Sequence, residues 1–238
     1  MNPFEQAVVV VPAHNEMAHL PTCLRSLTTA ALCLPVPTVI VVVLDACHDA
    51  SEGLAGEFGP DVHFVTVDAG NVGAARAAGF DYGRSLCTGV EDENVWYAAT
   101  DADSTVPADW LVRMTEAAAD VVLGVVRIAA WRNFSADVAR RYLHAYKSKG
   151  RSHNHIHGAN MGFRADAYWQ VGGFRGLASG EDVDLVRRFE SAGMHIHRDA
   201  TLSVATSDRR VGRAPGGFAN HLRELAGSVR KRKADAPP

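Results

Sequence analysis

Four short apolar runs alternate with helix-like segments in the first half of the chain, and this alternation limits the fold more than any other feature. The runs cover residues 7–11, 36–44, 62–67 and 95–99, and the first three are rich in valine. Continuous apolar runs of this length are typical of strands covered on both faces, as in a parallel sheet. We therefore predict βαβ units and an α/β fold, with Pro12 ending the first strand.

Length and composition indicate a single globular domain. The chain has 238 residues, of which 47% are hydrophobic and 21% are charged, and both values are close to globular averages. A formal net charge of −3 argues against a nucleic-acid partner. No apolar run approaches the roughly 20 residues of a membrane span, so we expect no integral membrane segment. The four cysteines have no metal-type spacing, which fits a reduced, cytoplasmic protein.

Two aspartates, Asp101 and Asp103, follow the fourth apolar run with Ala102 between them. In open α/β sheets ligands bind outside the carboxyl ends of the strands, so both carboxylates are expected at a binding site. Close carboxylates repel each other unless a positive charge lies nearby, and hard oxygen ligands suit Mg²⁺ or Mn²⁺. The pair therefore predicts a divalent-metal site. The alternative is that it caps a helix that begins at Pro107.

A glycine-containing stretch, residues 70–79, introduces a helix after the third run. It lacks the G-x-G-x-x-G pattern, and no such pattern follows the first run, so a nicotinamide cofactor is not expected. A glycine loop before a helix N-terminus is a natural anion site, and Arg76 lies one turn inside this helix. The alternative is an alanine-rich core helix with a surface arginine.

The second half of the chain is less regular. Its spacing predicts helices over 107–119 and 134–149, a strand over 121–128 and a helix that starts near Glu181. Glu181 and Asp182 would lie in the first turn of that helix, where acids also favour the helix dipole without any functional role.

Three arginines near the end of the sequence, Arg209, Arg210 and Arg213, lie in a glycine-rich segment. Such a loop could close over a diphosphate through bidentate guanidinium contacts. The alternative is a solvated surface loop.

Three histidines, His153, His155 and His157, occupy alternate positions and share one face if the segment is extended. Such a face can bind zinc or copper. We favour the alternative in which one or two rings line a pocket and hydrogen-bond to phosphate or sugar hydroxyls.

Together these segments resemble the family 2 glycosyltransferases, from about Val8 to Arg213. Residues 10–16 are similar to the family's first nucleotide loop, 44–51 to its second acidic motif, 71–76 to its glycine loop and 101–103 to its metal-binding D-x-D motif. Residues 158–160 and 171–174 resemble the acceptor-side segment, and 181–182 the motif that carries the catalytic base. The order and spacing of these motifs carry the resemblance.

The resemblance implies a GT-A (Rossmann-like), mostly parallel sheet flanked by helices in one domain over residues 1–228. The nucleotide-binding half would be 1–105, the acceptor-binding half 106–228, and residues 229–238 a basic, disordered tail. An inverting enzyme is implied, which moves a sugar from a UDP- or GDP-sugar to an acceptor hydroxyl. The Q-x-x-R-W signature of processive, membrane-bound members is absent, which favours transfer of a single sugar.

The resemblance also implies roles for individual residues. Asp182 is expected to be the general base, with Glu181 as the alternative. Mn²⁺ or Mg²⁺ is expected on Asp103 and Asp101, with His197 or His195 as a third ligand. The nucleotide sugar is expected to contact Asp101 and Asp103 and also Pro12, Ala13, His14, Asn15, Glu16, Asp45, Gly73, Arg76, Ala102, Asn160, Arg209, Arg210 and Arg213.

Two other classes of protein share parts of this pattern. A nucleotidyltransferase also uses a parallel sheet and paired acids, but it would be expected to have an N-terminal glycine-rich loop with a basic residue, which residues 12–16 lack. A non-catalytic module that binds a nucleotide sugar is the second class. The acids at 101, 103 and 182 argue against it.

Overall fold

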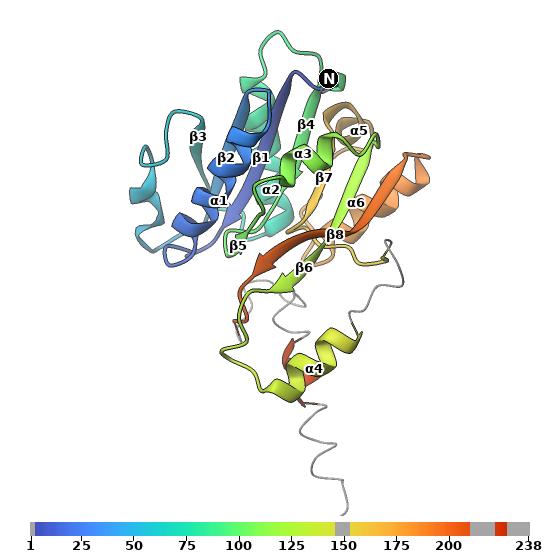
Figure 1. Cartoon of the computed structure of the whole chain (residues 1–238). Coiled ribbons are helices and arrows are strands. Elements are labelled where there is room, and N and C mark those ends of the chain that lie inside the picture. Colours follow the sequence, from blue (N-terminus) through green and yellow to red (C-terminus); the bar gives the residue numbers. More distant parts are fainter. Residues whose placement is uncertain (1–2, 146–152, 210–221, 228–238) are drawn as a thin grey trace, which may run out of the picture.

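The computed structural model describes residues 3–145, 153–209 and 222–227 and contains one eight-stranded sheet of order β3-β2-β1-β4-β7-β6-β8-β5 (Figure 1). Six strands run in one direction, whereas β5 and β7 run in the other. This confirms the predicted α/β fold with a mostly parallel sheet. The strands are β1 Gln6–Ala13, β2 Thr38–Asp45, β3 Val62–Val67, β4 Val95–Ala99, β5 Ser104–Thr105, β6 Val121–Ile128, β7 Met161–Arg164 and β8 Ile196–Thr206.

Helices cover both faces of this sheet. Those on one face are α1 (Leu20–Cys33) and α3 (Trp110–Thr115), and those on the other are α2 (Val72–Leu86), α5 (Ala165–Gln170) and α6 (Glu181–Ser191). Side chains of β1 alternate between the two cores, as expected for a strand buried on both sides: Val9 and Val11 pack with α1, and Val8 and Val10 with α2. Within the described ranges, no helix is both long and apolar enough to cross a membrane.

Pro12 does not end the first strand, contrary to the sequence-based expectation. β1 continues to Ala13 and pairs with β2 as far as Leu44, while its pairing with β4 on the other side ends at Val10 and Ala99. Pro12 therefore lies where β1 has one neighbour, and a residue without an N–H is tolerated there.

Two predicted helices are shorter than their sequence patterns suggested. After β2, the alternating pattern predicts a helix through Leu54 and Phe58, but the segment forms only a 3-10 helix, η1 (Ala50–Leu54), because glycines at 53, 56 and 59 disfavour a longer α-helix. The helix predicted over 107–119 is limited to α3, because the chain turns at Ala118 (φ 50°) and enters β6. The helix predicted over 134–149 is α4 (Ala136–Ala145) in the part that is described.

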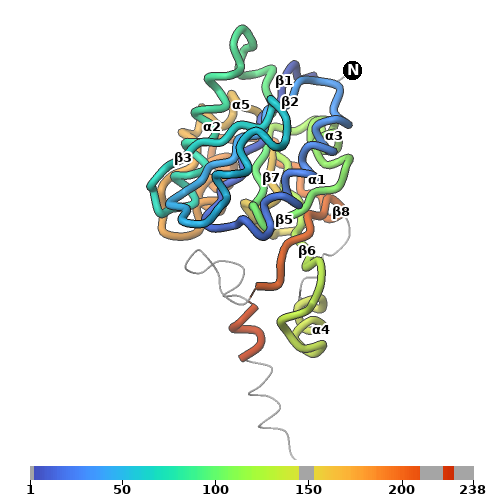
Figure 2. The backbone as a smooth tube through the Cα atoms, turned by 90° about the vertical axis from the view of Figure 1, so that its left-hand side faces the viewer, coloured from blue at the N-terminus to red at the C-terminus, as the bar shows by residue number. Residues whose placement is uncertain are grey.

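A small lobe lies beyond the carboxyl ends of β6 and β8 (Figure 2). It consists of α4 and the helical residues 222–227, which meet through Ile128, Tyr142 and Leu222. Asp208 connects this lobe to the end of β8, because its carboxylate accepts the backbone N–H groups of Arg132 and Asn133, both at 2.6 Å. The lobe thus stands at the edge of the sheet where ligands bind in such folds.

Helix α2 packs unusually close to the sheet. A Cβ on Gly79 would lie 2.5 Å from a methyl group of Val10, and a Cβ on Gly83 would lie 2.5 Å from one of Val8. These glycines let the helix backbone approach β1. The approach places Arg76, one turn before Gly79, under the carboxyl edge of the sheet.

Candidate functional site

Acidic side chains at or just after the ends of three strands, and at the start of one helix, lie at the carboxyl edge. Glu16 follows β1, Asp45 is the last residue of β2, Asp101 follows β4, and Glu181 and Asp182 begin α6. Parallel strands end at the same edge, so the sheet collects residues that are far apart in the sequence. Direct contacts through Arg76 join acids from the two halves of the chain.

The guanidinium group of Arg76 is the centre of this arrangement. Its Nη2 donates to Asp101 Oδ1 at 2.7 Å, and its Nη1 donates to Glu181 Oε1 at 2.5 Å. Only 3% of the Arg76 side chain is exposed, and the guanidinium lies 5.4 Å from the ring centroid of Phe174. Burial alone would lower the pKa of Arg76, but the nearby carboxylates outweigh burial and raise it. The arginine is therefore a permanent buried cation and not the surface arginine of the alternative interpretation.

Two glycines make room for these contacts. A Cβ on Gly73 would lie 2.2 Å from the carbonyl oxygen of Arg175 and 3.0 Å from Glu181 Cβ. A Cβ on Gly158 would lie 2.5–2.7 Å from the guanidinium atoms of Arg76. The glycine loop thus serves close packing between α2 and α6.

The adjacent acids of α6 have different surroundings. Glu181 is 7% exposed and is bound by Arg76. Asp182 is half-buried, and its Oδ2 accepts the backbone N–H of Gly158 at 2.9 Å. Both acids lie in the first turn of α6, as predicted, but their contacts exceed those of simple helix capping.

Asp103 is bound by the residues that end β8. Its carboxylate accepts hydrogen bonds from Ser207 Oγ at 2.6 Å and from Thr206 Oγ1 at 3.2 Å. Arg209 Nη2 lies 3.4 Å from the same carboxylate, and Arg209 Nη1 also donates to Glu16. The contacts of these two hydroxyl groups with Asp103 were not predicted from the sequence. Their position just before the arginine-containing segment was the one local signal for them.

The other two arginines of that segment, Arg210 and Arg213, lie outside the described residues. Arg209 is 30% exposed at its side chain, so the solvated-loop alternative does not hold for it. Burial would lower the pKa of Arg209, but Asp103 and Glu16 outweigh burial and raise it.

Asp45 organises the loop that precedes α2. Its carboxylate accepts the backbone N–H groups of Ala69, Gly70 and Asn71 at 2.8, 2.8 and 2.9 Å. The backbone carbonyl of Asp45 accepts Nδ1–H of His14 at 2.7 Å. These bonds fix the position of the glycine loop relative to the end of β2.

The first loop is held to the second in a similar way. Asn15 adopts a left-handed conformation (φ 55°), and its Oδ1 accepts the N–H of His48 at 2.7 Å. Pro12 and Ala13 form the end of β1. Ala102 is buried between the two aspartates of the D-x-D pattern.

Asn160 is a fully buried structural residue. Its Nδ2 donates to the carbonyls of Val125 and Leu202 at 2.8 and 2.9 Å, and its Oδ1 accepts Nε1–H of Trp110 at 2.9 Å. A side-chain contact with a nucleotide sugar would require these bonds to break. The expectation that Asn160 binds the donor is therefore not supported by its surroundings.

His197 is far from the paired aspartates. It pairs with Val122 of β6, whereas Thr206, which binds Asp103, pairs with Ile128. Six residues of strand separate these points, about 20 Å. The sheet register therefore removes His197 as a ligand of the same ion, and His195 lies farther still along the chain.

The three alternating histidines stack on one face, with ring centroids 5.8 and 5.9 Å apart. His153 Nε2 donates to the Leu123 carbonyl at 3.0 Å, and its Nδ1 accepts the N–H of His155 at 3.1 Å. Burial lowers the pKa of His153, which agrees with a neutral ring. Because both of its nitrogens are used, His153 is not available to a zinc or copper ion.

The class of this chain follows from its match to a protein family. The model of the family described as glycosyl transferase family 2 matches residues 8–172, which is more than half of the chain. This chain belongs to glycosyltransferase family 2. Membership confirms the resemblance seen in the sequence and favours a glycosyltransferase over the nucleotidyltransferase alternative. Comparison with curated proteins gives no match.

Solved structures with the same fold include two that were determined with a bound nucleotide sugar. A fragment of S. aureus TarS in complex with UDP-GlcNAc has a TM-score of 0.63 and 14% identity, over 98% of this chain and 68% of that one. The mannosyltransferase PcManGT from Pyrobaculum calidifontis, in complex with GDP-Man and Mn²⁺, has a TM-score of 0.59 and 17% identity, over 98% and 76%. The chain described here covers 44% of the length of a longer TarS structure. Identities this low show a shared fold.

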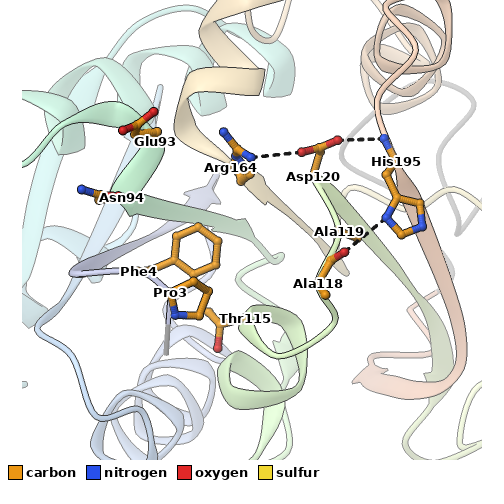
Figure 3. A pocket seen from close by; sticks show the side chains of 10 residues that line it. All are labelled: Pro3, Phe4, Glu93, Asn94, Thr115, Ala118, Ala119, Asp120, Arg164 and His195. Atoms are coloured by element: carbon orange, nitrogen blue, oxygen red, sulfur yellow. Dashed lines mark hydrogen bonds and ion pairs between the residues drawn. The ribbon is translucent and has the colours of Figure 1, made fainter. Parts of the chain in front are cut away.

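A separate cavity of about 520 Å³ lies at the opposite, amino edge of the glycosyltransferase sheet (Figure 3). Two of its charged groups lie together: Arg164 is 3.4 Å from Asp120, which also accepts the N–H of His195 at 2.8 Å. The acids at the carboxyl edge do not line it.

The buried bonds of Asn160 generate a prediction about this glycosyltransferase. Asn160→Ala leaves two carbonyls and an indole N–H unpaired in the core, so the free energy of unfolding should fall by about 2–4 kcal/mol. Denaturant unfolding measures this. Asn94→Ala is the control, because Asn94 makes an exposed side-chain bond to Glu5. Equal losses in both variants would contradict the structural role.

Proposed function

We propose that this protein transfers one sugar from a UDP- or GDP-sugar to an acceptor hydroxyl, with inversion at the anomeric carbon. The observation that carries the proposal is the guanidinium of Arg76, which holds Asp101 of the D-x-D pattern and Glu181 of the acidic helix turn in one hydrogen-bonded group. A base beside Glu181 is then near a leaving group held at the aspartate pair. UDP-GlcNAc in TarS and GDP-Man in PcManGT support a nucleoside diphosphate sugar as donor.

The general base in this proposal is Asp182. As the acceptor oxygen bonds to the anomeric carbon, its proton passes to the Asp182 carboxylate, and the bond from that carbon to the diphosphate oxygen breaks. Glu181 is less suited, because it is buried and bound by Arg76. Asp182 is half-buried, and the N–H of Gly158 orients its carboxylate.

A divalent ion is the proposed partner of the diphosphate. Asp101, Asp103 and the hydroxyls of Thr206 and Ser207 are hard oxygen donors of the kind that Mg²⁺ and Mn²⁺ prefer. Within the described ranges, no three His, Cys, Asp or Glu side chains form a metal cluster, but Mg²⁺ is commonly held by one or two carboxylates together with substrate phosphates. Asp103 and Asp101 would hold the ion, which when bound neutralises the diphosphate as a Lewis acid.

Arg209 provides the second positive charge at the diphosphate in this proposal. Its guanidinium now binds Glu16 and lies beside Asp103, so it is positioned at the donor-side acids. Turning toward a diphosphate would give it bidentate contacts and help to exclude water that would hydrolyse the donor.

The nucleobase is proposed to lie beside Asp45. A carboxylate has about four acceptor positions, and three N–H groups of the glycine loop use most of them. One further N–H can be accepted, such as the ring N–H of uracil or guanine. His14 and Asn15, held by the second loop, would border the same base.

The base assignment predicts the behaviour of Asp182→Asn. Asparagine cannot take the acceptor proton, so turnover should fall by a factor on the order of 10² or more while donor affinity is kept. Release of nucleoside diphosphate from UDP-GlcNAc and GDP-mannose, with donor binding by calorimetry, measures both. Asp184→Asn, two residues along the same helix, is the control. Full turnover by Asp182→Asn would place the base elsewhere, and no turnover by the parent protein with any donor would favour a non-catalytic module.

The metal assignment predicts a separate loss. Titrations of UDP and GDP should show tighter binding with Mn²⁺ in the parent protein, and Asp103→Ala should abolish the difference. Asp92→Ala, which removes an acid paired with Arg84 near the amino end of β4, is the control. An unchanged Mn²⁺ effect in Asp103→Ala would remove Asp103 as a ligand.

A further inference from the structure

Arg76 cannot reach a diphosphate as it is placed. Both Nη atoms bind carboxylates, only 3% of the side chain is exposed, and Nε has no partner among the described residues. Most buried N–H groups have a hydrogen-bond partner, so the unpaired Nε–H indicates that the two carboxylates fix the position of this guanidinium. Arg76 can therefore affect the reaction only through the acids that it binds.

Gly158 connects Arg76 to the neighbouring acid. One side of this residue lies against the guanidinium, where a Cβ would be 2.5 Å from Nη2, and its N–H donates to Asp182 Oδ2 at 2.9 Å. The same cation thus binds Glu181 directly and faces Asp182 across one glycine. Lysine could not replace it fully, because a single ammonium lacks the planar fork that contacts two carboxylates at once.

We propose that Arg76 is a positioning residue that fixes Glu181 as its ion-pair partner, leaves the adjacent Asp182 as the base, and ties the helix of both acids to Asp101 on the donor side. This inference rests on the proposed function. It changes the expected role of Arg76, which the sequence placed among the donor contacts.

The guanidinium of Arg76 from α2 is the positive charge next to Asp182, and it interacts electrostatically with Asp101, Glu181 and Asp182. Asp184 is paired with Arg188 and lies 3.6 Å from Arg175, and His157 precedes Gly158 in the chain. An opposite charge at short range lowers the pKa of a carboxyl group by one unit or more.

The test compares Glu181→Gln with the double variant Arg76→Met/Glu181→Gln. Carboxyl ¹³C NMR of the free protein, with the signal assigned by Asp182→Asn, gives the titration midpoint of Asp182 without any substrate. Glu181→Gln unmasks the arginine charge, so the midpoint should fall below that of the parent. Removing Arg76 from that background should raise the midpoint by about one unit. Repeating these titrations with His157→Gln added to each protein separates the titration of His157 from that of Asp182.

Kinetics give the second readout. Where the parent releases nucleoside diphosphate, the acid limb of its kcat–pH profile should move in the same directions, and Arg76→Lys should keep the limb near its parent position while lowering kcat more than it alters KM. Equal midpoints in Glu181→Gln and the double variant would overturn the inference. If the double variant does not fold, the isosteric Glu181→Gln variant still tests the inference, because a midpoint that is not lower than that of the parent would also overturn it. Failure of Asp182→Asn to lower turnover would instead overturn the proposed function and leave these midpoints unaffected.

Discussion

The ion pairs of Arg76 are the constraint on which the rest of the site depends. Removing a guanidinium from water carries an effective penalty of several kcal/mol, which is offset only by good geometry with opposite charges. Here the opposite charges come from the end of β4 and the start of α6, two elements that are 80 residues apart in the sequence. Loss of either partner would leave buried charge uncompensated. One cation therefore joins acids from the two halves of the chain at the carboxyl edge of the sheet.

That cation also separates the functions of the acids around it. Each D-x-D aspartate has its own positive partner, because Asp101 binds Arg76 and Asp103 lies beside Arg209. The same division applies to the adjacent acids of α6, of which one is bound by the guanidinium and the other by a backbone N–H. Close packing is what permits this, since any side chain larger than hydrogen at Gly158 would displace the arginine.

Much of the scaffold could be predicted from local patterns, whereas contacts that depend on register could not. The strand before Asp101 and the strand over 121–128 have the predicted bounds, because buried strands give continuous apolar runs. His197 was misjudged because its distance from the aspartate pair is set by how β8 pairs with β6, which no local pattern encodes. Asn160 resembled a ligand contact in sequence, but its partners lie on α3, β6 and β8. The ion pairs of Arg76 likewise join residues that only the folded sheet brings together.

A crystal structure with a bound nucleoside diphosphate, obtained with UDP and with GDP in the presence of Mn²⁺, would test the role of Arg76 most directly. We expect the diphosphate at the carboxyl edge, between Asp103 and Asp182, with Arg76 still bound to Asp101 and Glu181. A nucleotide in the amino-edge cavity of Figure 3, or Arg76 turned out onto the phosphates, would contradict it.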